Sequence, residues 1–404
     1  MSYPSFPRSV FAAVSLALVA SGCAVASGQD PPAGEAATIA SLAAVDDPSE
    51  KADAWDALVA EAEGQRVRWW LYGGDERINR YIDERVVPAA AQVGVELERV
   101  PIADTADAVQ RVVAEKQAGE TAGSVDLIWI NGENFALGRR AELWLENWAT
   151  ELPNARFVDP ASVATDFGVE VDGDESPWSR ALFVFAHDTD RMEQPPRTFA
   201  DLLAYAREHP GRITYPAPPD FTGAAFVRQV VQALGEDAAF DYLRELQPLL
   251  WREGRTFPSD EAELNQLFGD GQVDLAMSYD PSFVETAVRQ GVFSDTAVPF
   301  VLDHGTLNNV SYVTIPANAG SRAGALVVAN LLLDPQLQAE KADPDVLGVP
   351  TVLDLDRLSA VDRARFRAGA DSRYLLDDPE PLLAELPVDR VDALEQRWRD
   401  EVLP

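Results

Sequence analysis

The sequence predicts an α/β protein built as two lobes. Runs of β-rich apolar residues alternate with helix-like segments before residue 150, and a second alternation follows an irregular stretch at 144–173. Residues 53–404 also exceed the roughly 250–300 residues at which a single core stops growing. Each lobe is therefore expected to be a mostly parallel sheet flanked by helices, with a ligand cleft between the lobes.

The first alternation has the strand, helix, strand, helix, strand order of right-handed βαβ units. The apolar run Arg66-Val67-Arg68-Trp69-Trp70-Leu71-Tyr72 stops at two glycines, and Asp75 opens the next segment. The expected elements are a strand at 66–72, a helix at 75–93, a strand at 95–102, a helix at 105–119 and a strand at 125–130. Ligands of open α/β sheets collect at the carboxyl ends of such strands.

The second alternation begins with the apolar run at 181–186. The expected elements are helices at 198–208, from 222, at 237–249, at 259–268 and at 323–333, and strands at 212–216, 273–279, 298–302 and 311–315. The chain from Leu355 onward is charged and helix-like. We assign 53–180 to the first part of lobe 1, 181–296 to lobe 2, and 297–404 to a return to lobe 1 with C-terminal helices.

The N-terminal residues predict a lipoprotein signal. Cys23 is the only cysteine, and it follows Arg8, an apolar run at 10–20 and three small residues. Residues 1–22 are the expected signal peptide, with lipid on Cys23. Ala20 stands where such signals prefer Leu, so a plain secretory signal and a buried helix remain alternatives. Residues 23–52, rich in Ala, Gly, Pro, Asp and Ser, predict a flexible tether on the extracytoplasmic side.

Composition restricts the function. A net charge of −34 disfavours nucleic acid and favours a cationic ligand. His187, His209 and His304 are scattered, and no catalytic or phosphate-binding motif is found, so no enzyme activity, cofactor or resident metal is expected. The many carboxylates leave a secreted hydrolase open, and an anchored adhesion or scaffold module is a further alternative.

Four stretches carry a family resemblance. They are Trp70-Leu71-Tyr72-Gly73-Gly74-Asp75 with Ile78-Asn79, Asp126 to Phe135 (DLIWINGENF), Tyr215 to Gly223 (YPAPPDFTG) and Asp274 to Tyr279 (DLAMSY). Over residues 66–350 the chain resembles the extracellular solute-binding proteins of ABC importers, especially the YnjB-like group related to thiamine-type and iron-type binding proteins. The resemblance implies a type II periplasmic-binding-protein-like fold, a hinged cleft for one solute, and a permease and an ATPase as partners of a lipid-anchored monomer.

Residues at the ends of the expected strands and at one helix start are candidate ligand contacts. Backbone amides and missing side chains at strand ends suit a polar ligand. A helix start at Thr222 and Gly223 offers free N–H groups to an anion. These candidates are Tyr72, Gly73, Gly74, Asn131, Gly132, Glu133, Asn134, Phe221, Thr222 and Gly223. Plain turn and capping roles are the structural alternatives.

Aromatic residues beside carboxylates form the second set of candidates. Trp129, Trp178, Tyr279 and Asp280 could cage an organic cation, although core packing is the alternative for each aromatic ring. Asn308 and Asn309 precede a strand near the expected return crossing. The predicted ligand is an organic cation of thiamine or polyamine type, with an oxyanion as the runner-up. Ferric iron is less favoured because sites in the iron-type relatives use adjacent tyrosines, and only Tyr279 stands at that strand end.

Overall fold

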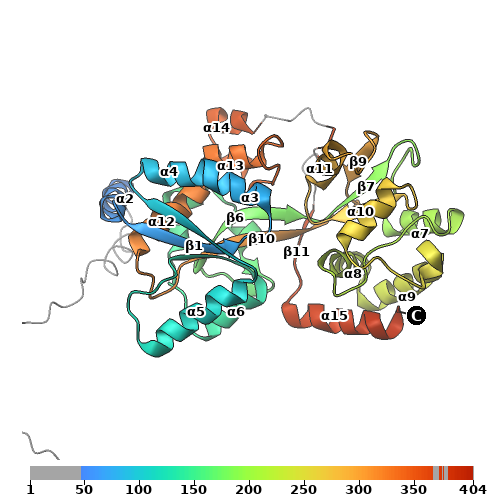
Figure 1. Cartoon of the computed structure of the whole chain (residues 1–404), viewed down its shortest axis with the longest axis horizontal. Coiled ribbons are helices and arrows are strands. Elements are labelled where there is room, and N and C mark those ends of the chain that lie inside the picture. The colour runs from blue at the N-terminus through green and yellow to red at the C-terminus, as the bar shows by residue number, and fades with distance from the viewer. Residues whose placement is uncertain (1–46, 367–372, 375, 377–380, 404) are drawn as a thin grey trace, which may run out of the picture.

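Two lobes lie side by side, joined by strands that run between them, in a computed structural model (Figure 1). The structure describes residues 47–366, 373–374, 376 and 381–403. Cys23, the predicted signal peptide and the predicted tether as far as residue 46 lie outside the described residues. Each lobe has its own hydrophobic core. Within the described residues, no helix has the length and apolar character needed to cross a bilayer.

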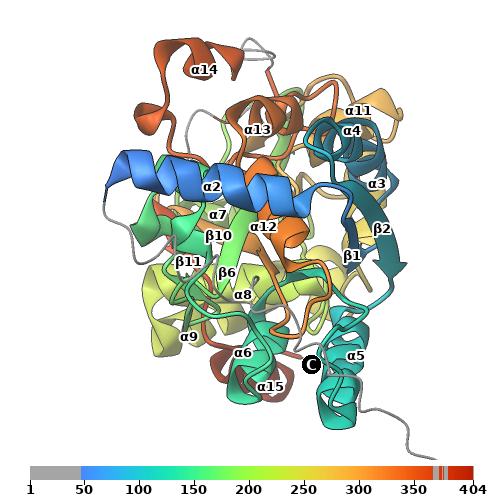
Figure 2. The same cartoon turned by 90° about the vertical axis from the view of Figure 1, so that its left-hand side faces the viewer.

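The first lobe begins with the elements that the sequence predicts. They are β1 (Arg66–Tyr72), α3 (Glu76–Tyr81) continuing through a π-helical turn (Ile82–Val86) into α4 (Val87–Gln92), β2 (Glu96–Ile102), α5 (Thr105–Ala118), β3 (Leu127–Ile130) and α6 (Gly132–Arg140). The Asp75 side chain caps α3 by accepting the Arg77 and Ile78 N–H groups. One helix, α2 (Pro48–Ala62), starts inside the predicted tether because Asp47 caps it and Leu58 and Ala62 are buried. It lies across the first lobe against α12 (Figure 2).

The first-lobe sheet is mixed rather than mostly parallel. Strands β1, β2 and β3 are parallel, whereas β10 (Thr306–Thr314) runs antiparallel to β3 and to β6 (Glu175–Leu182). The remaining elements are 3-10 turns at Ala149–Glu151, Pro153–Phe157, Pro160–Val163 and Leu355–Arg357, strands β4 (Thr165–Asp166) and β5 (Val169–Glu170), and helices α12 (Arg322–Leu332), α13 (Pro335–Ala342) and α14 (Ala360–Arg365). The sheet contains antiparallel strands because β6 runs out of the first lobe and β10 runs back into it.

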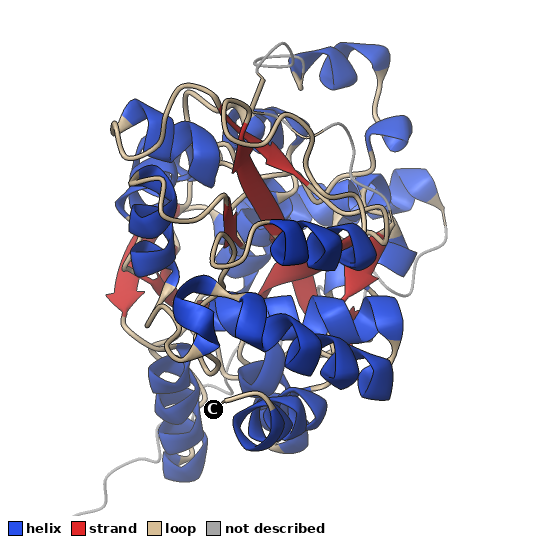
Figure 3. Ribbon diagram, turned by 90° about the vertical axis from the view of Figure 1, so that its right-hand side faces the viewer, coloured by secondary structure: helices blue, strands red, loops and turns tan. Residues whose placement is uncertain are grey.

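The second lobe encloses a short sheet in helices (Figure 3). Its elements are β7 (Val184–Asp188), α7 (Phe199–Glu208), α8 (Phe221–Leu234), α9 (Glu236–Leu246), 3-10 turns at Gln247–Leu249 and Trp251–Gly254, α10 (Glu261–Gly269), β8 (Leu275–Ser278), α11 (Phe283–Arg289) and β9 (Ala297–Phe300). The sheet order is β8-β7-β9 with antiparallel pairs, so the predicted parallel sheet is wrong here. Strand β7 leads away from the first lobe, whereas β8 and β9 lead back toward it.

The predicted strand at 212–216 is extended but joins no ladder. The Asp274 N–H donates to the Arg212 carbonyl oxygen at 2.7 Å, and the Trp251 N–H donates to the Ile213 carbonyl oxygen at 2.8 Å. Prolines at 216, 218 and 219 follow directly and lack the N–H groups that a ladder would need. The segment is therefore a buried connection beside β8.

The predicted return to lobe 1 at residue 297 comes too early. Strand β9 pairs with β7 in the second lobe, and only β10 crosses back. A short strand, β11 (Leu382–Ala384), pairs with the start of β10, and the chain then enters the C-terminal helix α15 (Val388–Glu401). This helix packs on α8 and α9 of the second lobe because Leu394 and Trp398 form its buried face.

Candidate ligand-binding site

The turn after β1 carries an exposed aromatic side chain. Tyr72 is 47% exposed, and its phenol lies against Gly74, where an added Cβ would be 2.1 Å from the hydroxyl oxygen. The Asn79 side-chain amide donates to the Gly73 carbonyl oxygen at 2.9 Å. Glycines here let the aromatic ring fold over the turn, so Tyr72 presents an exposed aromatic face.

The two candidate tryptophans, one in β3 and one in β6, differ in burial. Trp129 is half-buried, and its ring meets Trp178 edge-on at a centroid distance of 4.9 Å. Trp178 is only 1% exposed, and its other side packs on Trp69 at 5.4 Å. The prediction of Trp178 as a ligand contact is therefore not supported. Its ring is part of the first-lobe core, in a stretch of β6 that is buried on both faces.

The start of α6 is covered by a hairpin that the sequence did not reveal. The Gly132 N–H donates to Asp166 Oδ2 at 2.5 Å, and the Phe167 ring lies 3.3 Å from where a Gly132 Cβ would stand. Asn131 precedes the helix without a side-chain capping bond. Asp166 is 2% exposed, and this burial raises the pKa of its carboxyl group to about 7, with the Glu385 charge acting in the same direction.

The remaining candidates on α6 lie on its first turn. Glu133 is exposed and Asn134 is half-buried. Both follow Gly132, whose positive φ of 58° sets the direction in which the helix leaves the strand. They stay candidates for contacts at the outer edge of the cleft.

The start of α8 is occupied by carboxylates, which argues against the predicted anion site. Asp220 accepts the Gly223 N–H at 2.9 Å, and the Thr222 hydroxyl donates to Glu261 Oε2 at 2.6 Å. Burial raises the pKa of both carboxyl groups. An added Cβ at Gly223 would lie 2.0 Å from the Pro216 carbonyl oxygen, so this glycine serves close packing.

A network fixes the aromatic residues of the second lobe. Phe221 is 51% exposed, and its ring centroid lies 5.0 Å from that of Tyr279. The Tyr279 hydroxyl donates to Glu385 Oε1, and the Arg228 guanidinium donates to both Glu385 oxygens at 2.8 and 3.1 Å. Burial, followed by the Glu385 charge, raises the pKa of Tyr279 well above its usual value. Tyr279 is therefore held as a neutral donor.

Arg77 connects the two lobes on one side of the cleft. Its guanidinium, on α3, donates to Asp280 at 2.7 Å and to the hydroxyls of Ser282 and Thr286 at 3.1 Å each. Asp280 therefore forms an interlobe ion pair rather than standing free for a ligand.

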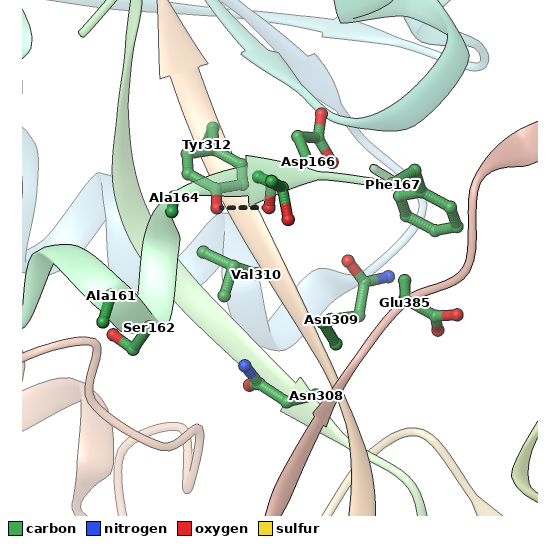
Figure 4. A pocket seen from close by; sticks show the side chains of 12 residues that line it. Ala161, Ser162, Ala164, Asp166, Phe167, Asn308, Asn309, Val310, Tyr312 and Glu385 are labelled. Atoms are coloured by element: carbon green, nitrogen blue, oxygen red, sulfur yellow. Dashed lines mark hydrogen bonds between the residues drawn. The ribbon is translucent and has the colours of Figure 1, made fainter. Parts of the chain in front are cut away.

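The predicted asparagines line a small cavity where the crossing strands meet (Figure 4). Asn308 and Asn309 come from β10, Asp166 and Phe167 from the β4–β5 hairpin, and Glu385 from the segment after β11. Asn308 and Asn309 are 8% and 7% exposed, and their Oδ1 atoms have no hydrogen-bond partner among the described residues. The cavity volume is about 50 Å³.

In the structure, most of the predicted contact residues therefore touch residues that were not identified from the sequence. These missed residues are Arg77, Asp166, Phe167, Arg228, Glu261 and Glu385. Arg228 had a usable signal, because it is the only charge in the apolar run of α8 and a buried charge needs a partner. In the described part of the chain, no group of three or more His, Cys, Asp or Glu residues is placed to hold a metal ion.

Comparisons with known proteins agree with this architecture. Residues 84–360 match the family model of the bacterial extracellular solute-binding proteins. Protein YnjB of Escherichia coli (strain K12) is 41% identical over 364 residues, covering 85% of this chain and 92% of that protein.

Solved structures share the fold at low sequence identity. A periplasmic thiamin binding protein superimposes with a TM-score of 0.56 at 17% identity, covering 83% of this chain and 96% of that chain. The spermidine/putrescine ABC transporter substrate-binding protein PotD of Streptococcus pneumoniae strain Canada MDR_19A gives 0.60 at 11% identity, covering 84% and 99%. At these identities the likeness establishes the type II periplasmic-binding-protein fold alone.

Proposed function

The chain belongs to the bacterial extracellular solute-binding protein family, the substrate-binding components of ABC importers, and from this premise we propose that its solute is an organic cation of thiamine or polyamine type. The observation that carries the proposal is a set of buried carboxyl groups around the crossing strands and the cleft. Asp166 and Glu175 are buried, Glu261 is half-buried, and none of the three has an ion pair with an arginine or lysine among the described residues.

Electrostatics favour a cation at such groups. A buried carboxylate without a positive partner is costly, and burial accordingly raises the pKa of Glu175 well above its usual value. A bound cation would supply the missing charge. The exposed rings of Tyr72 and Phe221 at the two edges add cation–π contacts of about 0.5 to 2 kcal/mol each.

The two runner-up ligands fit the geometry less well. An oxyanion at the start of α8 would meet the carboxylates of Asp220 and Glu261. A ferric site would need a tyrosinate, whereas the Tyr279 hydroxyl is committed to Glu385. The thiamin- and polyamine-binding proteins with the same fold show that the fold can hold organic cations.

The proposal includes a lipid anchor on Cys23 and a monomer that delivers its solute to a permease and an ATPase. One copy supplies both faces of the cleft, which supports a monomer. A Cys23→Ala variant should leave the membrane fraction and appear in the soluble extracytoplasmic fraction. Recovery of this variant at full level in the membrane fraction would contradict the anchor.

Calorimetric titration with thiamine, spermidine and sulfate tests the choice of ligand. A true ligand at 100 times its dissociation constant should also stabilise the protein by about 2.7 kcal/mol in thermal melting. Saturable sulfate binding without cation binding would refute the proposal. Hydrolysis of a glycoside or ester without binding of any solute would favour the secreted hydrolase instead.

A further inference from the structure

We propose that a cavity lined by Arg180 is a second binding site, which takes an organic carboxylate with an apolar body. Leu353 of the first lobe and Pro281 and Ser282 of the second line the same cavity, whose volume is about 470 Å³. Small-molecule sites typically measure roughly 300–1,000 Å³. None of the described lining residues is a candidate ligand contact, so this site goes beyond the proposed function and does not depend on which solute is transported.

Arg180 is a half-buried arginine of β6 that lacks a partner. Its Nε–H is buried without an acceptor, and its guanidinium forms no hydrogen bond or ion pair with any residue that the structure describes. A buried donor without an acceptor and a charge without a counter-ion both cost free energy. Such groups in a native structure indicate an absent partner. A bound anion would supply it.

The acidic side chain that acts on Arg180 is already engaged elsewhere. Burial lowers the pKa of the Arg180 guanidinium, and the charge of Asp159 acts in the opposite direction. Asp159, however, accepts the Ala161 N–H at 3.2 Å and lies 3.9 Å from Arg357. Its carboxylate caps a 3-10 turn instead of pairing with Arg180.

A second buried cation, Lys341, is influenced by the charge of Arg180. Lys341 is completely buried, and its Nζ donates to the Trp178 carbonyl oxygen. Burial, followed by the Arg180 charge, lowers the pKa of Lys341 well below its usual value. An arginine keeps its proton in proteins, so Arg180 is the group that would hold an anion.

The carboxylates that line the cavity already have arginine partners. They are Glu285 with Arg289 at 2.7 Å, Asp354 with Arg357 at 3.0 Å and Asp356 with Arg363 at 3.4 Å. Among the described lining residues, Arg180 is therefore the charged group without an ion pair.

The remaining lining determines what the anion carries. Apolar residues that line the cavity are Leu182, Pro281, Pro350, Leu353 and Leu382. An apolar chain is stabilised when such a surface removes it from water, whereas a small hydrated anion gains nothing from it. The planar guanidinium also matches the two oxygens of a carboxylate, which its N–H donors bind in parallel. Monocarboxylates with an apolar body fit both properties.

The test is calorimetric titration of the full chain with hexanoate, acetate and hexanol at neutral pH. Hexanoate should bind roughly 10-fold or more tightly than acetate, which lacks the apolar body, and than hexanol, which lacks the charge. Arg180→Met keeps an unbranched apolar side chain and should weaken hexanoate roughly 10-fold or more. Arg180→Lys keeps the charge and should weaken it less than Arg180→Met.

Arg140→Met is the matched control, because Arg140 is an exposed arginine at the end of α6 that does not line the cavity. It should leave hexanoate affinity unchanged. Equal hexanoate affinity in Arg180→Met and the unmodified protein, or hexanol binding as tightly as hexanoate, would overturn the site. If Arg180→Met fails to fold, Arg180→Lys and the three probes on the unmodified protein still decide.

Thermal melting without hexanoate separates a binding role of Arg180 from a structural one. Since Arg180 has no partner to lose, Arg180→Met should melt no lower than the unmodified protein, and a lower melting temperature would overturn the argument. Saturating spermidine or thiamine should not displace hexanoate, and displacement would show one site instead of two. Failure of every cation to bind would overturn the proposed function alone.

Discussion

The two lobes present different faces to the cleft. On the first lobe, the face consists of turns in which backbone and an exposed ring predominate, as at Tyr72, Gly73 and Gly74. On the second lobe, the face is a network in which Arg228, Glu385 and Tyr279 fix one another. One face is therefore preorganised by buried charge, whereas the other can adjust to a ligand by small movements of turns and exposed side chains.

The largest effect should come from breaking the second-lobe network with Arg228→Leu. Both partners of the Arg228–Glu385 pair have side chains 3% exposed, so the change leaves a buried carboxylate unpaired and should cost about 3 to 5 kcal/mol in the free energy of unfolding. Urea denaturation measures this. Arg207→Leu, which breaks the exposed Arg207–Glu245 pair of the same lobe, should cost at most about 1 kcal/mol. Equal losses for the two variants would contradict the comparison.

The next effect concerns pH and Asp166 on the first lobe. Its folded pKa of about 7 lies above an unfolded value of about 3.9, so its contribution to stability is full below about pH 4 and is lost as the pH rises through 7. The unfolding free energy of the unmodified protein should therefore fall, relative to Asp166→Asn, by on the order of 4 kcal/mol between pH 4 and pH 8. If the unfolding free energies of the two proteins change with pH in parallel, Asp166 does not titrate as proposed.

Glycine substitutions compare the rigidity of the two faces directly. Gly223→Ala places a Cβ 2.0 Å from the Pro216 carbonyl oxygen, a backbone atom, and should cost about 1 to 3 kcal/mol. Gly74→Ala meets only the end of the exposed Tyr72 side chain, which can rotate away, and should cost less than about 1 kcal/mol. Thermal melting measures both. A larger loss for Gly74→Ala would mean that the first-lobe turn is the stiffer one.

The smallest effect on stability should come from Arg77→Met, which removes the ion pair between the lobes. Its partners Arg77 and Asp280 are about one-third exposed, so the pair contributes at most about 1 kcal/mol to stability. The radius of gyration in small-angle scattering should nevertheless increase, because the lobes lose a direct contact. Arg99→Met breaks an ion pair with Asp83 inside the first lobe and should leave the radius unchanged. An unchanged radius of gyration for Arg77→Met would show that Arg77 does not hold the two lobes together.

Local patterns in the sequence were sufficient for most individual elements. Strand β1 has the predicted bounds, and α7 begins directly after Thr198, which caps it in a capping box with Asp201. Strand direction in the second lobe was predicted wrongly because it depends on which distant strands pair. Segment 212–216 was predicted as a strand for the same reason, since local sequence does not determine whether a neighbouring strand is present to pair with it.

Candidate contacts could be named from the sequence where a strand ends, and not where distant segments meet. Tyr72 ends β1, and Asn131 and Tyr279 directly follow β3 and β8, so the rule for α/β sheets predicts that they contact a ligand. Asp166 and Glu385 lie in irregular segments far apart in the sequence, and only the folded crossing strands bring them to one cavity. Trp178 was misplaced because a tryptophan beside a predicted crossing can equally face the core.

The position of α15 determines when the second-lobe core can be completed during synthesis. Trp398 donates to the Tyr215 hydroxyl at 3.0 Å, and its ring lies 5.1 Å from Phe257, so residues near the chain end complete the second-lobe core. The first-lobe core likewise draws on residues from β10 to Leu358. A nascent chain can therefore complete the first core only after Leu358 has been synthesised, and the second only after α15 has left the ribosome.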